Sequence, residues 1–134
     1  IEVDVSSRGW DYGVERAALR GAEVIVPVIR FTEAGRRGDG KLVVRAAAKR
    51  RIPVIFAGAE MVEAGGLMSY GTNLVDEVRR GADLLARVLK GEKPANLPVD
   101  QAARFELVVN LKTAKAIGIT IPQSIMLRAD RVIE

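Results

Sequence analysis

The chain has 134 residues, enough for one domain or part of one, and its 21 Lys and Arg outnumber its 17 Asp and Glu, for a formal charge of +4. It contains no cysteine and no histidine, which excludes thiol catalysis, zinc sites built on those residues and any Ser-His dyad within this chain. Its apolar runs are too short to span a membrane and its basic residues lack interleaved aromatics, so neither a spanning segment nor a nucleic-acid partner is expected.

The first half of the chain alternates strand and helix patterns. In order, these are a strand at Ile1–Val5, a helical face ending at Gly21, a strand at Val24–Ile29 weakened by Pro27, a polar loop at 32–40, a helix at Leu42–Arg50, a strand at Ile52–Phe56 and a helical turn at Met61–Val62. Strands that alternate with helices of crossover length predict an α/β protein with a parallel sheet and right-handed connections.

The stretch Gly65–Gly91 organises the rest of the chain. It contains a short strand at Leu67–Met68, a polar loop at Ser69–Thr72 and the longest helix in the sequence. Asn73 is expected to cap the start of this helix, and Gly91 to end it in a left-handed conformation. Apolar residues at spacings of three and four form one stripe along it, which must pack on a partner: Leu74, Val75, Val78, Ala82, Leu85, Val88 and Leu89.

After Gly91 the pattern changes. The sequence predicts, in order, an extended linker at Glu92–Gln101, a strand at Phe105–Val109, a helix at Lys112–Ile117 ended by Gly118, an extended segment at Ile119–Pro122 and a weakly helical tail at Ser124–Glu134.

Motifs for catalysis are weak. The run GRRGDGK at 35–41 nearly matches a phosphate-binding loop, but Leu42 occupies the position of the magnesium-binding hydroxyl, so a surface loop is the better interpretation. Asp76 and Glu77 complement the positive end of the long helix. Ser69 and Ser124 have no activating base, so neither catalysis nor a cofactor is expected.

Three polar segments follow predicted strands: Ser69–Thr72, Ala57–Glu60 and Arg30–Thr32. Open α/β sheets bind ligands at the carboxyl ends of their strands, so these segments are expected to converge at one edge. A tyrosine there supplies a flat apolar face with a polar tip. The sequence therefore predicts a binding site, with ordinary connecting loops as the competing interpretation.

Three runs resemble a known family: EAGGLMSYG at 63–71, RVLKGEKPANLPV at 87–99 and FELVVNLKTAKAIGITIP at 105–122. Together they resemble the C-terminal part of ABC transporter substrate-binding proteins, over residues 52–134. Residues 1–51 fit the expected order of elements but match that family less well.

The resemblance implies a type I periplasmic-binding-protein fold, in which two α/β lobes joined by three crossovers close on a small solute. The chain would be a truncated form of it. Residues 1–70 would belong to the second lobe, residues 71–97 to a crossover and a helix that packs on the missing first lobe, and residues 98–134 to the return into the second lobe. Without the first lobe, the fragment is expected to self-associate through the 74–90 helix, fold it back or aggregate.

By the same resemblance, the protein would be the solute-binding component of a bacterial ABC importer, without enzymatic activity. It would capture an amino acid-like or carboxylate solute and deliver it to a membrane permease, in the periplasm or another extracytoplasmic space, with a signal peptide expected upstream. The expected ligand contacts are Ser69, Tyr70 and Thr72, with Gly58 and Glu60 second. A ligand-sensing regulatory domain of the same fold is the alternative; a signal peptide would favour transport, and a fused DNA-binding or kinase segment would favour regulation.

Overall fold

The computed structural model describes residues 9–27, 39–99 and 104–134. The expected strand Ile1–Val5, the segment Arg30–Thr32 and most of the glycine-rich run at 35–41 lie outside these residues. The helices are α1 (Gly9–Leu19), α2 (Asp39–Lys49), α3 (Ala59–Glu63), α4 (Leu74–Leu89), α5 (Leu111–Ile117) and α6 (Gln123–Met126), with a 3-10 turn η1 at Pro94–Asn96. The strands are β1 (Ile55–Phe56), β2 (Met68–Thr72), β3 (Phe105–Asn110) and β4 (Arg131–Ile133).

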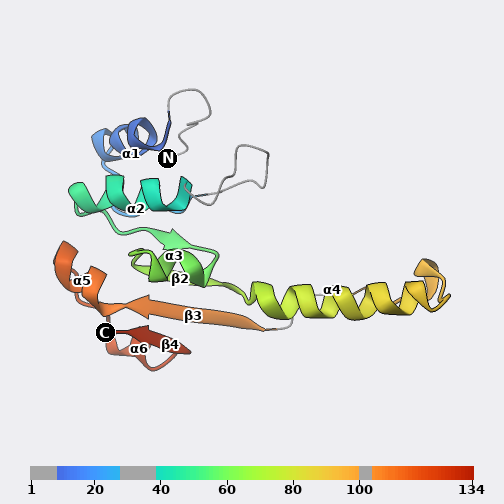
Figure 1. The fold of residues 1–134 in the computed structure, drawn as a ribbon. Coiled ribbons are helices and arrows are strands. Elements are labelled where there is room, and N and C mark those ends of the chain that lie inside the picture. The colour runs from blue at the N-terminus through green and yellow to red at the C-terminus, as the bar shows by residue number, and fades with distance from the viewer. Residues whose placement is uncertain (1–8, 28–38, 100–103) are drawn as a thin grey trace.

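The strands of the described residues form one sheet in the order β1-β2-β3-β4 (Figure 1). β1 runs parallel to β2 and β3 runs parallel to β4, whereas β2 and β3 are antiparallel. Ile25 extends the sheet beyond β1 through an isolated parallel bridge to Val54, with its amide donating to the carbonyl of Pro53 at 2.9 Å. The predicted α/β architecture with a mostly parallel sheet is confirmed.

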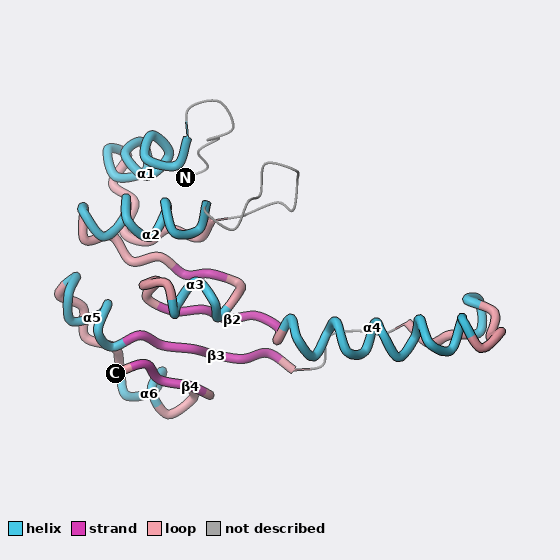
Figure 2. Tube along the Cα trace, in the orientation of Figure 1, coloured by secondary structure: helices cyan, strands magenta, loops and turns pink. Residues whose placement is uncertain are grey.

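The antiparallel pairing follows from the path of the chain. The chain leaves the sheet at Thr72, runs outward through α4 and returns at Phe105, which lies opposite Thr72 (Figure 2). β3 therefore retraces β2 in the opposite direction. The segment Ser69–Thr72, predicted to be a loop, belongs to β2, because every one of its residues pairs with a residue of β3.

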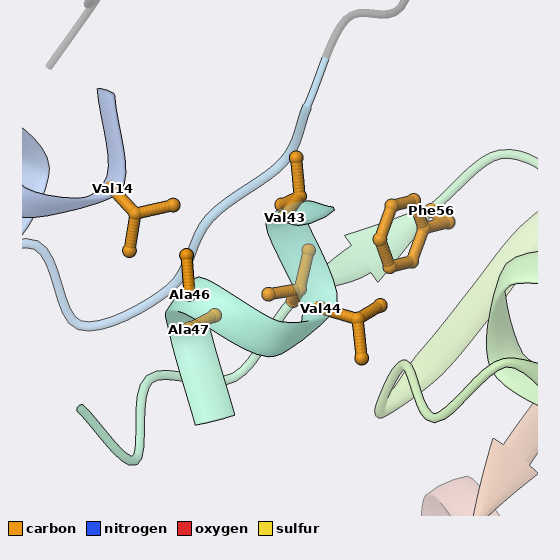
Figure 3. Packing of buried hydrophobic residues seen from close by; sticks show 7 residues of the cluster. Val14, Val43, Val44, Ala46, Ala47 and Phe56 are labelled. Carbon is orange, nitrogen blue, oxygen red and sulfur yellow. The ribbon is translucent and has the colours of Figure 1, made fainter. Parts of the chain in front are cut away.

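The larger apolar core lies between the two N-terminal helices and β1 (Figure 3). α2 contributes positions spaced by three and four, so one face of this helix is buried. The members of this core are Val14, Val43, Val44, Ala46, Ala47, Val54 and Phe56. A smaller cluster joins Leu67 to Ala114 and Ile117 of α5.

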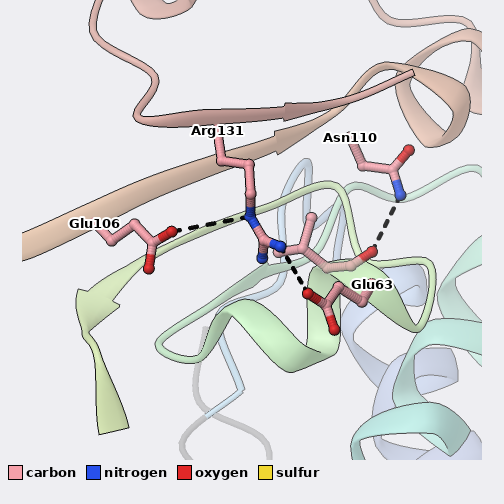
Figure 4. Close-up of polar contacts among 5 residues, drawn as sticks. Glu63, Glu106, Asn110 and Arg131 are labelled. Carbon is pink, nitrogen blue, oxygen red and sulfur yellow. Dashed lines mark hydrogen bonds and ion pairs between the residues drawn. The ribbon is translucent and has the colours of Figure 1, made fainter. Parts of the chain in front are cut away.

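Polar contacts hold α3 to β3 and β4 (Figure 4). The buried side-chain amide of Asn110 donates from Nδ2 to the carbonyl oxygen of Val62 at 3.0 Å. Arg131 forms an ion pair with Glu63 at 2.8 Å and a longer one with Glu106 at 3.8 Å. The short helix α3 is thus tied to two strands that follow it much later in the sequence.

α4 begins and ends where the sequence predicts. The Asn73 side chain accepts hydrogen bonds from the amides of Val75 and Asp76 at 3.0 and 3.3 Å, as an N-cap does. Gly91 follows the last turn with a φ of 98°, the left-handed conformation that favours glycine.

α4 extends away from the sheet, and none of its residues is buried (Figures 1 and 2). Five large members of its apolar stripe are between 58% and 79% exposed, and Val88 is partly buried; the five are Leu74, Val75, Val78, Leu85 and Leu89. Most of this apolar face is therefore open to solvent. Within residues 9–27, 39–99 and 104–134, no helix is both long enough and apolar enough to cross a bilayer.

The C-terminal region agrees with the prediction through α5, which ends at Gly118 with a φ of 79°. The tail Ser124–Glu134, predicted to be weakly helical, differs. Only its first residues belong to α6, and Arg131–Ile133 pairs with β3 as β4. The strand forms because β3 offers a free edge, which a local pattern cannot reveal.

Candidate functional site

The ends of three strands meet at one edge of the sheet. β1 and β2 are parallel and end at this edge, and β3 begins there because it is antiparallel to β2. We call this region, formed by residues 57–60, 69–72 and 105, the crossover edge. It is the side of an open α/β sheet at which ligands bind.

Gly71 brings two segments of the crossover edge into contact. A Cβ atom on Gly71 would clash with the carbonyl group of Ala57, so β2 passes directly against the end of β1. A residue with a side chain could occupy this position only if one of the two segments moved. The expected convergence of segments 57–60 and 69–72 is therefore present in the structure.

Gly58 and Glu60 follow Ala57 in the chain, where α3 begins. Gly58 is extended and precedes the first turn of α3, with no side-chain cap for the helix. The carboxylate of Glu60 folds back over Gly58. It lies so close that a Cβ atom added to Gly58 would overlap it. Glu60 is exposed, so this carboxylate is open to solvent at the crossover edge.

The pleat of β2 separates the other expected contacts. Alternate residues of a strand face opposite sides of the sheet, so Ser69 and Gly71 share one face while Tyr70 and Thr72 share the other. Ser69 is 1% exposed, and its Oγ has no hydrogen-bond partner among the described residues. Tyr70 is 58% exposed, and Thr72 is half-buried. The structure thus brings Ser69 and Tyr70 to opposite faces of the sheet rather than to one surface.

Phe105 is a residue of the crossover edge that sequence reasoning missed. Its ring stacks on that of Tyr70, with centroids 5.4 Å apart and ring planes 20° from parallel. Phe105 is itself 49% exposed. The sequence marks Phe105 only as the first residue of a predicted strand. Its position beside Tyr70 depends on the antiparallel pairing of β2 with β3.

The crossover edge offers two aromatic rings, one carboxylate, the hydroxyls of Ser69, Tyr70 and Thr72, and backbone groups. These groups can hold a small solute by packing and by hydrogen bonds. Within the described residues, no three His, Cys, Asp or Glu side chains gather as metal ligands would.

Arg87 and Glu92 have shifted pKa values and lie away from the crossover edge, at the far end of α4. Arg87 donates hydrogen bonds to Glu92 at 2.6 and 2.8 Å. These bonds lower the pKa of the Glu92 carboxyl and raise the pKa of the Arg87 guanidinium. Because the pKa of Glu92 is lowered, the ion pair is formed above that pKa and is lost as the pH falls through it.

Comparison with known proteins identifies a matching family and solved structures with a similar fold. A family model described as ABC transporter substrate binding protein matches residues 36–133. A conserved domain protein from Vibrio cholerae O1 biovar El Tor is 28% identical with a TM-score of 0.80, over 92% of this chain and 40% of its own. An ABC domain from Streptococcus pneumoniae, solved in complex with L-Trp, is 31% identical with a TM-score of 0.76, over 92% of this chain and 41% of its own.

A third solved structure shares the fold at lower identity. The ligand-free, open substrate-binding protein with adhesive properties from Clostridium difficile is 23% identical with a TM-score of 0.60, over 92% of this chain and 40% of its own. None of the curated proteins compared with this chain matches it.

The chain thus spans about two fifths of the length of these solved structures, at 40% and 41% of the first two. The family match covers most of the chain and includes β1 to β4, the crossover edge and α4. The family suggested by the sequence is confirmed: the chain belongs to the ABC transporter substrate-binding proteins.

Proposed function

We propose that this chain is part of the solute-binding component of an ABC importer, which captures a small solute and delivers it to a membrane permease. The observation that carries the proposal is the crossover edge, where the chain leaves the sheet at Thr72 and returns to it at Phe105. A solute bound at this point touches the segments that connect one lobe to the other. Such a solute can favour a closed arrangement through contacts made only when both lobes are present.

In this proposal, residues 1–70 and 98–134 belong to the second lobe, and residues 71–97 reach the first. The exposed stripe of α4 supports this division, because a face of several Leu and Val side chains costs several kcal/mol when left in water. The first lobe covers that stripe. A chain that lacks the first lobe associates with other copies through the same stripe.

The proposed solute is amino acid-like or a small carboxylate. Tyr70 and Thr72 contact it from the exposed face of β2, and Gly58 and Glu60 approach from the end of β1. Ser69 is also a proposed ligand contact. Its buried Oγ lacks a hydrogen-bond partner among the described residues, and a polar atom of the solute would supply one. The L-Trp complex of the Streptococcus pneumoniae structure, 31% identical, supports an amino acid with a ring.

The mechanism requires capture alone. The open lobes admit the solute, contacts at the crossover edge and on the first lobe hold it, and the closed form docks on the permease. Proteins of this kind act outside the cytoplasmic membrane, so we place the protein in the periplasm or another extracytoplasmic space.

The test is a thermal-shift screen of the complete two-lobe protein against the L-amino acids and small carboxylates. A ligand that binds only the folded state raises the melting temperature, so one chemical group is expected to stand out. A flat screen with every compound at saturating concentration contradicts the proposal.

Two variants then locate the site for the compound that binds. Tyr70→Ala is expected to weaken binding about tenfold, because it removes the largest exposed contact. Glu60→Gln tests the other side of the crossover edge, and it weakens binding if the solute carries an amino group. Leu127→Ala is the matched control, since Leu127 is an exposed apolar residue on the C-cap of α6. Unchanged binding in both Tyr70→Ala and Glu60→Gln would move the site away from the crossover edge.

A further inference from the structure

Aromatic side chains are scarce in this protein, and those that the structure describes differ in how far they are buried. The chain has one Trp, two Tyr and three Phe. Of the aromatic side chains that the structure describes, Phe56 is 3% exposed and belongs to the core. Tyr70 and Phe105 are about half exposed, and both lie at the crossover edge.

The register of the sheet explains why these two rings meet. Tyr70 lies opposite Leu107, and Phe105 is two residues before Leu107 on the same strand. Tyr70 and Phe105 are therefore diagonal neighbours on one face of the antiparallel pair, at a separation that aromatic side chains can bridge. Their nearly parallel rings stack on each other, so each ring keeps an outer face and edges free of the other; we call this pair the aromatic shelf.

The exposure of the shelf distinguishes it from an ordinary cross-strand pair. Stacking one ring on the other stabilises the end of the sheet and requires contact only between their inner faces. Both residues remain exposed despite this contact, Tyr70 at 58% and Phe105 at 49%. An exposed apolar surface at the point where the chain passes between lobes is suited to packing against a bound molecule.

We propose that Phe105 is a ligand-contacting residue that, with Tyr70, packs against a flat or bulky apolar part of the solute. This inference rests on the function proposed above and adds a specificity determinant to it. Glu60, Thr72 and backbone groups would recognise the polar part of the solute. The shelf would set the preference for the size and flatness of its side chain.

The experiment measures affinities by calorimetry for L-phenylalanine, L-leucine and glycine on the complete two-lobe protein. The wild type is expected to prefer L-phenylalanine over L-leucine, and both over glycine. Phe105→Ala is expected to weaken binding of L-phenylalanine by about three- to tenfold, the range of one aromatic contact, and to leave glycine affinity unchanged. Phe105→Tyr, which keeps the ring, is expected to restore the wild-type preference.

A residue that only supports Tyr70 would not change which solute is preferred. Phe105→Leu therefore provides the second readout, because it retains apolar bulk and loses the flat ring. It is expected to reduce the preference for L-phenylalanine over L-leucine even if circular dichroism shows Phe105→Ala to be poorly folded. Leu127→Ala again serves as the exposed apolar control.

The outcomes separate this inference from the proposed function. If the wild type binds amino acids and the Phe105 variants keep both affinity and preference, the proposed role of the shelf is wrong and the proposed function stands. If the wild type binds carboxylates but none of the three amino acids, the proposed role of the shelf is also wrong and the proposed function stands. If nothing binds in this experiment or in the wider screen, both are wrong.

Discussion

At Gly71 the backbone of β2 passes so close to the carbonyl group of Ala57 that no side chain fits between them. Gly71→Ala is therefore expected to push β2 away from the end of β1 and to lower the free energy of unfolding by about 1–3 kcal/mol, the usual cost of overpacking. Urea denaturation followed by circular dichroism measures this change on the 134-residue chain.

Gly81→Ala is the matched control for that substitution. A Cβ atom on Gly81 meets no atom within 4 Å, and alanine is a better helix former than glycine in the middle of α4. Its unfolding midpoint is expected to be equal to or higher than that of the wild type at the same low protein concentration. Equal midpoints for Gly71→Ala and the wild type would show that the contact with Ala57 is loose.

Asn110 connects three elements through one buried amide. Its Nδ2 donates to the carbonyl oxygen of Val62, and its Oδ1 accepts from the amide of Thr113 as the N-cap of α5, both at 3.0 Å. Asn110→Ala removes both bonds and leaves the Val62 carbonyl without this donor, so a loss of about 2–4 kcal/mol in unfolding free energy is expected.

Asn110→Asp separates the two roles, since a carboxylate still caps α5 but cannot donate to Val62. Because Asn110 is buried, the introduced carboxylate loses solvation and faces the Val62 carbonyl oxygen, so a loss at least as large as that in Asn110→Ala is expected. Asn96→Ala, an exposed asparagine in η1, is expected to change stability by less than about 0.5 kcal/mol. A loss in Asn96→Ala as large as that in Asn110→Ala would contradict the assignment.

Residue-scale features could be predicted where their chemistry is local. Asn73 and Gly118 could be assigned to helix ends because capping depends on residues within a turn or two. The roles of Asn110 and Phe105 could not be predicted in the same way. The acceptor of Asn110 lies 48 residues earlier in the chain, and Phe105 meets Tyr70 only once the strand register is fixed.

At the scale of elements, α4 is the feature for which the sequence was most informative. Its caps, its length and its apolar stripe all depend on periodicity within one segment. β2 shows the opposite case. Its sequence Met68–Thr72 contains Ser, Gly and Thr and favours a loop by propensity, but hydrogen bonds from β3 make it the centre of the sheet.

The exposed stripe of α4 predicts the behaviour of the 134-residue chain in solution. Because most of the stripe is exposed in the described residues, the chain is expected to self-associate. Val78→Glu with Leu85→Glu places charges in the middle of the stripe and is expected to shift the chain toward monomers in sedimentation-velocity experiments.

A control for this variant introduces acidic charge elsewhere on the helix. Arg79 is exposed and lies outside the apolar stripe, so Arg79→Glu changes the net charge by the same two units without touching the stripe. Its association is expected to match that of the wild type. A wild-type chain that sediments as a monomer at high concentration would contradict the proposed role of α4.

At the scale of the whole molecule, the class of fold and the family could be predicted, whereas the direction of β3 could not. Alternating strands and helices indicate a parallel sheet, and that inference holds for β1 with β2 and for β3 with β4. The excursion through α4 reverses the chain, and the sequence contains no local mark of that reversal. The same reversal places Phe105 at the crossover edge.

The proposed capture mechanism predicts a change in overall dimensions. Saturating solute is expected to decrease the radius of gyration of the complete two-lobe protein in solution scattering, because the closed form brings the lobes together. Tyr70→Ala at the same solute concentration is expected to retain the larger, open value. A radius that is unchanged by a solute known to bind would argue for recognition without closure.

The pairing of Thr72 with Phe105 has a consequence for engineering. Residues 73–104 leave the sheet and return to it at a single rung of the ladder, so the two ends of this long excursion are neighbours. Antiparallel strands with adjacent ends can be joined by a two-residue Asn-Gly turn. Replacing residues 73–104 by such a turn would convert β2 and β3 into a simple hairpin, and would yield a shorter chain that lacks the apolar helix.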